Sequence, residues 1–333
     1  MATYKGEKGF TIQTIAGDPP SPILGQVWYN TTSNVLKGYL TVTGAWSSGG
    51  NLNTGRASSA GAGTSQTTGL CIAGHGHYPL AYVNYNESYN GSAWSEENNL
   101  NTARYSQGGC GTQTAAITMS GYANAYPMKD ETEIWNGTSW TEVNNVLTGR
   151  KEVKGCGTTA AAILPGGNLP PSFSPVYAAL NESWDGTSWS EVNNIPTPTM
   201  STATLGTQTA AIMAGGYTGS YVGTSYGWDG TCWTAGNNLN QLRANTNAGC
   251  GTSTDGMIVG GFIPPYAAQT ETFDGTSWTE VADLPSGTYD GSVASNSPSG
   301  NSLYVGGQAA PAAYNNLTEE WTSGANVVTF TSS

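Results

Sequence analysis

The chain has 333 residues, of which 10 are Lys or Arg and 22 are Asp or Glu, so its formal net charge at pH 7 is −12. An acidic chain with few scattered basic residues lacks a phosphate-binding patch, and no apolar run is long enough to cross a bilayer, so we expect neither nucleic-acid binding nor membrane insertion. With 46 Gly, 11 Trp and 18 Tyr, the composition favours strands and turns and is too aromatic for a disordered chain.

The start of the chain lies outside the repeats that follow. Its first ten residues contain no apolar stretch of the kind found in secretory signals, so we expect synthesis in the cytoplasm without a signal peptide. Strands are predicted at residues 10–16 and 26–30, and a hairpin at 36–46. We predict that residues 1–24 form an N-terminal arm, which either docks onto a larger assembly or supplies a strand of the first repeat, and that 25–333 form the main domain.

A hairpin signal recurs along the rest of the chain at intervals of 44–49 residues. In five of the units, Asn-Gly or Asp-Gly separates an aromatic residue from a Trp that follows it. These dipeptides accept positive φ in tight turns, so each predicts two strands joined by a short turn. The recurring tryptophans are Trp46, Trp94, Trp140, Trp189, Trp233 and Trp278.

The remaining half of each unit is also repeated. Gly-x-Gly-Thr occurs at 61–64, 109–112, 155–158 and 249–252, and a short apolar run that ends in Gly follows it. The small residues suit a crowded inner strand, and the apolar run suits a second strand that is buried on both faces. Four strands in about 46 residues is a spacing typical of propeller blades.

These repeats resemble those of kelch-type β-propellers. The resemblance rests on the Gly-Gly pairs at 215–216, 260–261 and 306–307, together with the aromatic residue and the Trp that follow them. It implies an all-β chain with four-stranded antiparallel blades. Counting the hairpins at both ends favours seven blades, with 10–16 and 26–30 as the missing inner strands. The alternative is six blades with an N-terminal hairpin outside the ring.

A second resemblance covers residues 17–46. Here Gly25-Gln26-Val27-Trp28-Tyr29-Asn30 opens one strand, Thr32-Ser33-Asn34 turns, and Leu36-Lys37-Gly38-Tyr39 returns. This segment resembles a hairpin module of bacteriophage tail-fibre and virion proteins. Combined with the repeats, it resembles kelch-like proteins encoded by marine bacteriophages, including phages of cyanobacteria. The resemblance implies a place in the virion, with other virion proteins as partners and a host-surface glycan as a further binding partner.

One repeat position carries an arginine in four units, while Met200 and Tyr289 stand there in the other two. If the arginines line one rim of the central channel, they form a collar that binds carboxylates or acidic sugars. The alternative is that each caps loop carbonyls and pairs with a repeated glutamate. The arginines are Arg56, Arg104, Arg150 and Arg243, and the glutamates are Glu87, Glu133, Glu182, Glu271 and Glu319.

The loops after the second strand of each unit differ in length and carry aromatic residues. In a propeller these loops project from one face, where a rigid scaffold presents recognition residues. We expect their rings either to stack on sugars or to vary without constraint. The tyrosines singled out are Tyr78, Tyr126, Tyr177, Tyr221 and Tyr266.

No residue is predicted to be catalytic, and neither a metal nor a cofactor is expected. The carboxylates recur in register, which is typical of structural acceptors. The five cysteines include no Cys-x-x-Cys pair, and three of them fill the same small packing position of the repeat. His75 and His77 are the only histidines and lack a third ligand nearby in the sequence.

The function predicted from the sequence is a non-enzymatic virion structural protein of the tail, fibre or capsid surface, which contacts other virion chains or recognises the host. A carbohydrate-binding module that is not part of a particle is the alternative. A carbohydrate-active enzyme is the third hypothesis, which a unique acidic pair in one channel would support.

Overall fold

The computed structural model describes residues 12–23, 25–76, 82–123, 128–170, 176–244, 249–309 and 313–330, and these form strands, turns and loops. The chain divides into two compact units, Met1–Gly44 with Ser323–Ser333, and Ala45–Thr322. The predicted division after residue 24 therefore falls inside the first unit, which also takes in the end of the chain. Within the described ranges, no helix is long and apolar enough to span a membrane.

The first unit contains the predicted N-terminal hairpin. Strand β2 (Val27–Asn30) pairs antiparallel with the first part of β3 (Val35–Ser48), and β1 (Gln13–Ile15) lies parallel to β2. In the turn, Asn30 Oδ1 accepts hydrogen bonds from the amides of Thr32 and Ser33 at 3.0 and 3.1 Å. These pairings confirm the hairpin of the 17–46 motif. The separate hairpin predicted at 36–46 is wrong, because Val35–Ser48 is one continuous strand.

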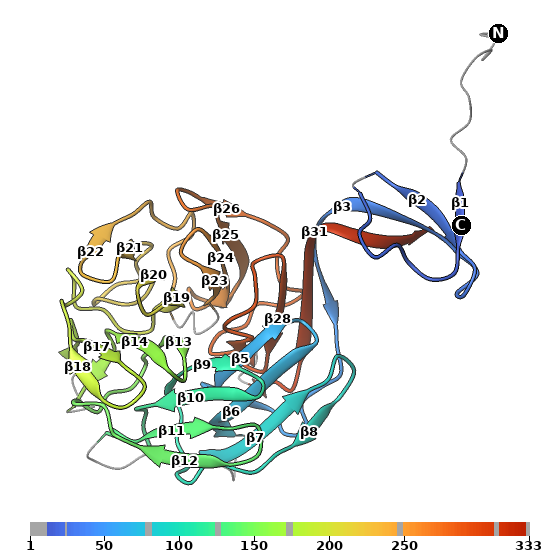
Figure 1. Ribbon diagram of the computed structural model, residues 1–333. Helices are drawn as coiled ribbons and strands as arrows, with labels where there is room; N and C mark the ends of the chain where they lie inside the picture. Colours follow the sequence, from blue (N-terminus) through green and yellow to red (C-terminus); the bar gives the residue numbers. More distant parts are fainter. Residues whose placement is uncertain are drawn as a thin grey trace. The chain divides into compact units, whose positions relative to one another are not determined.

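The second unit is a ring of antiparallel sheets that follow one another in chain order, as the colours in Figure 1 show. Each of the first five sheets has four main strands that pair in chain order, with small residues on the innermost one. The first sheet contains β5 (Ala60–Ser65), β6 (Thr68–Gly76), β7 (Val83–Tyr89) and β8 (Trp94–Glu96), and the second contains β9 (Gly108–Thr112), β10 (Ala115–Met119), β11 (Thr132–Trp135) and β12 (Trp140–Val143). The third contains β13 (Cys156–Thr158), β14 (Ala161–Pro165), β17 (Asn181–Trp184) and β18 (Trp189–Glu191), and the fourth contains β19 (Ala203–Thr207), β20 (Ala210–Ala214), β21 (Ser225–Trp228) and β22 (Trp233–Ala235). The fifth contains β23 (Gly249–Thr252), β24 (Asp255–Gly261), β25 (Ala267–Phe273) and β26 (Trp278–Glu280).

The sixth sheet joins the two ends of this unit. Strands β27 (Ser292–Val293) and β28 (Asn301–Val305) pair with each other, and β28 pairs with the start of β31 (Thr318–Phe330). Gly49, just after β3, donates its N–H to the carbonyl of Thr318 at 2.8 Å. Residues from both ends therefore complete one sheet, and β27 packs against β5 of the first sheet.

Three further pairs of short strands lie at the edges of these sheets. Strand β4 (Arg56–Ala57) pairs with the end of β6, β15 (Asn168–Leu169) pairs with β16 (Val176–Tyr177), and β29 (Gln308–Ala309) pairs with β30 (Ala313–Tyr314). The pairs β15–β16 and β29–β30 lie in the loops that follow the second strands β14 and β28, and β4 contacts the end of the second strand β6.

A backbone hydrogen bond that links neighbouring sheets recurs six times. In each case a glycine with φ between +91° and +121° donates its N–H to the carbonyl of a residue in the next sheet, at 2.8–3.0 Å. Residues with a side chain rarely adopt this φ, which explains why glycine recurs at this position of the repeat. The pairs are Gly74–Arg104, Gly121–Arg150, Gly167–Thr199, Gly216–Arg243, Gly261–Thr288 and Gly307–Arg56.

The preference for seven blades rests on a strand pair whose placement needs correction. It placed residues 10–16 and 26–30 in a further inner pair, but β1 and β2 lie in the other unit and pair parallel to each other. The described residues of Ala45–Thr322 form six sheets of three or more strands, because the first part of β3 forms a hairpin with β2 and only its end joins the ring. The number of blades stays a prediction.

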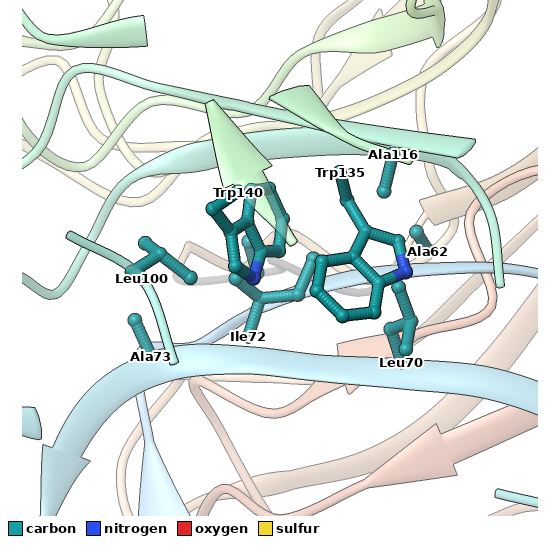
Figure 2. Packing of buried hydrophobic residues seen from close by; sticks show 9 residues of the cluster. Ala62, Leu70, Ile72, Ala73, Leu100, Ala116, Trp135 and Trp140 are labelled. Atoms are coloured by element: carbon teal, nitrogen blue, oxygen red, sulfur yellow. The ribbon is translucent and has the colours of Figure 1, made fainter. Parts of the chain in front are cut away.

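Hydrophobic clusters lie between neighbouring sheets. In the one drawn in Figure 2, Trp135 and Trp140 of the second sheet pack over Leu70 and Ile72 of the first. Trp135, Leu70 and Ile72 are at most 2% exposed. Each buried aromatic removes roughly 150–250 Å² from water, so the tryptophans of one sheet stabilise its contact with the preceding sheet.

Candidate functional site

A cavity of about 350 Å³ lies on the axis of the ring. All six sheets, with their adjoining loops, contribute to its wall, whereas a wider hollow of about 530 Å³ is bordered only by the second and third sheets. A concave site with aromatic, hydroxyl and charged groups is the usual form of a small-molecule site. The wall consists of Ser58, Tyr105, Ser106, Glu152, Met200, Tyr217, Tyr221, Ala244, Phe262 and Asp290.

The polar part of the wall is built on a repeated left-handed backbone position. Ser58, Ser106, Glu152, Ser201 and Asp290 have φ between 52° and 57°. Their backbones are joined in succession, because each of the first four donates its N–H to the carbonyl of its counterpart in the preceding sheet, at 2.7–2.9 Å. This conformation is costly for residues other than Gly and persists only where the surroundings fix it. We call these five residues the axial ring.

Two carboxylates of the axial ring face the cavity. Asp290 Oδ2 accepts a hydrogen bond from Ser58 Oγ, and Glu152 Oε2 accepts one from Ser201 Oγ, both at 2.9 Å. Burial raises the pKa of Asp290 to about 7; the negative charge of Glu152 adds to this rise, and the Ser58 hydroxyl opposes it. The two carboxylates are therefore close enough for the charge of Glu152 to influence the ionisation of Asp290.

Aromatic rings form a continuous series on the same face. Tyr217 contacts Tyr221 at a centroid distance of 5.3 Å, and Tyr221 contacts Phe262 at 5.7 Å. Phe262 in turn contacts Tyr266 at 5.8 Å and Tyr289 at 5.2 Å. These contacts between rings limit how far the side chains can move, so the series is a preformed apolar surface beside the carboxylates.

Of the tyrosines singled out in the sequence, the structure brings two into this series. Tyr221 lines the cavity, and Tyr266 stacks on Tyr289 with an interplanar angle of 10°. Tyr177 contacts Tyr217 at 5.9 Å and so extends the series outside the cavity wall. Tyr78 and Tyr126 lie outside the described residues.

The arginines do not form a ligand-binding collar on the cavity wall. Arg56, Arg104, Arg150 and Arg243 are 0% exposed, and each pairs with the glutamate of its own sheet. Arg104 Nη2 lies 3.1 Å from Glu133 Oε1, and Arg243 Nη1 lies 2.5 Å from Glu271 Oε1. A buried guanidinium that already holds a carboxylate has no free face for an acidic ligand, so the alternative interpretation describes these residues.

The register of the fourth and sixth units also needs correction. The residues in the arginine position are Thr199 and Thr288, because their carbonyls accept the same inter-sheet bonds as those of the arginines. Met200 and Tyr289 are one residue further on. The fourth unit lacks the glutamate as well, with Tyr226 in its place, and there the Tyr226 hydroxyl lies 3.0 Å from Thr197 Oγ1.

Sequence reasoning missed the axial ring. Its members stand two residues after the arginine position and read Ser, Ser, Glu, Ser and Asp, which shows no common motif. When the units are aligned in the corrected register, this position of the repeat carries an acid in two units and a small polar residue in the others. That difference is the feature of the sequence that could have pointed to the site.

His75 is not part of a metal site in the described residues. His75 packs between Tyr105 and Tyr314, with centroids 5.1 Å away in both cases, and burial lowers its pKa. His77 lies outside the described residues. No cluster of three or more His, Cys, Asp or Glu side chains that could hold a metal occurs where the structure is described.

The antiparallel sheets around an axial cavity define a β-propeller. No family model matches the chain, and no curated protein matches it. Among solved structures, that of YjhT is similar, with a TM-score of 0.68 and 12% sequence identity; the match covers 84% of this chain and 99% of that chain. At this identity the likeness concerns the fold alone.

Proposed function

We propose that this protein is a non-enzymatic component of a bacteriophage virion, whose propeller binds a carbohydrate on the host surface through the axial cavity. The observation that carries the binding role is the cavity wall, where aromatic rings, serine hydroxyls and two carboxylates meet. Aromatic faces pack against the C–H faces of sugar rings, while hydroxyls and carboxylates accept and donate hydrogen bonds at their edges.

The place in the virion rests on the N-terminal hairpin and its resemblance to modules of phage tail-fibre and virion proteins. The hairpin belongs to a compact unit of its own, Met1–Gly44 with Ser323–Ser333. A unit distinct from the ring is suited to contact other virion proteins while the ring carries a separate binding site. The propeller is the kelch-like part, and the tail, fibre or capsid surface is its location.

A binding assay on cells tests the proposal. Fluorescent wild-type protein and Tyr221→Ala are added to cells of a bacterium on which a phage encoding the protein grows, before and after periodate oxidation of surface glycans. We expect saturable binding that is lost after oxidation and falls at least about tenfold in affinity in Tyr221→Ala, which corresponds to about 1.4 kcal/mol.

Tyr29→Ala is the matched control, because Tyr29 is an exposed tyrosine of the N-terminal unit. It should bind cells as the wild type does. Binding that survives oxidation, or that Tyr221→Ala leaves unchanged, would remove the proposed carbohydrate site. If residues 1–24 dock the protein, particles assembled with a chain that lacks them should not carry it.

A carbohydrate-active enzyme is the second candidate, because Glu152 and Asp290 are two acids in one cavity and are not part of the repeated glutamate set. Turnover is measured as new reducing ends released from host-surface polysaccharide. Release by the wild type that disappears in Glu152→Gln would favour the enzyme, and binding without release favours the non-enzymatic role. A free carbohydrate-binding module would bind equally well and be absent from purified particles.

A further inference from the structure

The charge on the cavity wall has one sign. Among the residues that line its described part, Glu152 and Asp290 are the charged ones, and both are acidic. The four arginines nearest in sequence to the axial ring are each paired with a glutamate outside the cavity. An acidic sugar would therefore meet two carboxylates.

The two carboxylates stand on opposite sides of the axis. Successive N–H to carbonyl bonds connect Asp290 to Ser58, Ser58 to Ser106 and Ser106 to Glu152, so three steps separate the acids. In a ring of six sheets, three steps correspond to half a turn. A ligand group on the axis is thus approached by a carboxylate from each side.

The side chains around Glu152 hold it in this position. Ser201 Oγ donates to its Oε2, and Lys151 Nζ lies 3.4 Å from its Oε1. Lys151 is also placed over the ring of Tyr122, 5.1 Å from its centroid, and is not among the residues of the cavity wall. The carboxylate is anchored from outside the cavity, and its charge faces inward.

The rest of the wall favours an organic cation over a metal ion. The described residues provide no cluster of three carboxylate, imidazole or thiolate ligands. They do provide the faces of Tyr217, Tyr221 and Phe262, and aromatic faces attract ammonium groups and cover sugar rings.

We propose that the axial cavity is selective for amino sugars, with the protonated amine between Glu152 and Asp290 and the sugar ring against Tyr221 and Phe262. This inference rests on the proposed carbohydrate site and specifies its ligand class. It predicts discrimination by charge among saccharides of the same length, because opposite charges attract and like charges repel across a partly desolvated cavity.

Calorimetric titration at pH 7 tests the inference with three tetrasaccharide probes: a glucosamine tetramer, an N-acetylglucosamine tetramer and a tetramer that contains glucuronic acid. We expect the amine probe to bind about tenfold more tightly than the neutral probe, and the acidic probe to bind most weakly. Glu152→Gln and Asp290→Asn should each reduce the preference for the amine to about threefold or less.

Glu191→Gln is the matched control, since Glu191 is an exposed carboxylate at the end of β18 and should leave all three affinities unchanged. Equal binding of the amine and neutral probes by the wild type would overturn the charge selectivity and leave the carbohydrate site standing, as would a preference that survives in both variants. Absence of binding by all three probes would overturn both. Circular dichroism of each variant verifies that it is folded.

Discussion

The buried Arg150 is held by several acceptors besides its glutamate. Arg150 donates from Nε to the Gly166 carbonyl and from Nη1 to that of Thr148, both at 2.8 Å, and Glu182 Oε2 accepts the Leu147 amide at 2.6 Å. Burial lowers the pKa of the Arg150 guanidinium, and the charge of Glu182 opposes that shift. The pair therefore connects the segment before the third sheet to the sheet's third strand, β17.

Removing one charge of this pair should be costly. We expect Glu182→Gln to lower the free energy of unfolding by about 3–5 kcal/mol, because the guanidinium stays buried without its counter-charge. Urea denaturation of the folded variant measures the loss. Glu191→Gln on the same sheet is exposed and should change stability by less than about 0.5 kcal/mol. A loss below about 1 kcal/mol for Glu182→Gln would contradict the assignment.

The raised pKa of Asp290 makes stability depend on pH. Its folded value of about 7 lies above the value near 4 of an exposed aspartate, so between these pH values the folded state binds more protons than the unfolded chain. The free energy of unfolding should therefore fall as pH rises from about 4 to 7, by at most about 1.4 kcal/mol per pH unit for this group.

Denaturation curves for the wild type and Asp290→Asn across pH 4–8 isolate this contribution. The groups that share its field include Glu152, Tyr289 and Tyr314. We expect Asp290→Asn to become more stable relative to the wild type as pH rises from about 4 to 7. Above about pH 7 the difference between the two should stay constant. Parallel curves across the whole range would show that Asp290 titrates as an exposed acid.

At the scale of the strand, Lys154 occupies an unusual position just before β13. The corresponding residues of four other sheets are Ala60, Gly108, Ala203 and Ser292, all of them small. Lys154 is 0% exposed, its Nζ makes no hydrogen bond to the residues that the structure describes, and burial lowers its pKa to about 8. The ammonium group thus costs free energy at neutral pH.

We expect Lys154→Met to raise the free energy of unfolding at pH 7 by about 1–3 kcal/mol, because methionine keeps the apolar stem and removes an unsatisfied polar group. The advantage should shrink as pH rises from 8 to 10.5, since over that range the folded state already holds fewer protons than the unfolded chain. Lys37→Met is the control, because Lys37 lies 2.8 Å from the part-exposed Asp18 in the other unit. If Lys154→Met is instead less stable than the wild type, a partner stabilises the Lys154 ammonium group in the folded protein.

At the scale of the strand, the sequence predicts a feature well when the residues that form it are close together in the chain. Asp185-Gly186 predicts a turn because the aspartate itself accepts the amides of Thr187 and Ser188 at 2.8 Å, and Gly186 adopts φ +93°. The aromatic residues that pack across sheets follow from the same repeat. The sequence allows two interpretations of the repeated arginines, a ligand-binding collar and arginine–glutamate pairs, and only burial in the fold selects between them.

The axial ring and the cavity were not predictable in the same way. Glu152 and Asp290 are 138 residues apart, and they face one cavity only because six sheets close around an axis. The limits of the two units were missed for a related reason. Strand β31 contributes Thr318–Thr322 to the ring by pairing with β28, and no periodic signal marks where the ring ends and the other unit begins.

At the scale of the whole molecule, the ring is held shut by the sixth sheet. Trp46, near the end of β3, donates Nε1 to the carbonyl of Ala282 at 3.1 Å and to Thr270 Oγ1 at 3.2 Å. Its ring lies 5.1 Å from that of Trp321. In every other sheet the corresponding Trp is on a strand continuous in sequence with its neighbours, whereas Trp46 joins residues from opposite ends of the chain.

Trp46→Ala should therefore open the ring at this sheet before it unfolds elsewhere. Because Trp46 is half-buried, we expect an overall loss of about 2 kcal/mol, less than the 3–5 kcal/mol typical of a fully buried tryptophan. Native-state hydrogen exchange should show faster exchange of the β28 amides and of the start of β31 by local opening, with β14 and β20 still protected.

Trp189→Ala is the matched comparison, since Trp189 holds the same position in the third sheet, is 5% exposed and donates Nε1 to Thr132 Oγ1 at 3.0 Å. Its larger loss of stability should appear as faster global unfolding, because the third sheet is tied to both neighbours by the chain and cannot swing open alone. If Trp46→Ala leaves the exchange of β28 no faster than that of β14, the ring does not open at the sixth sheet, and the bonds from Gly307 to Arg56 and from Gly49 to Thr318 are enough to hold it closed.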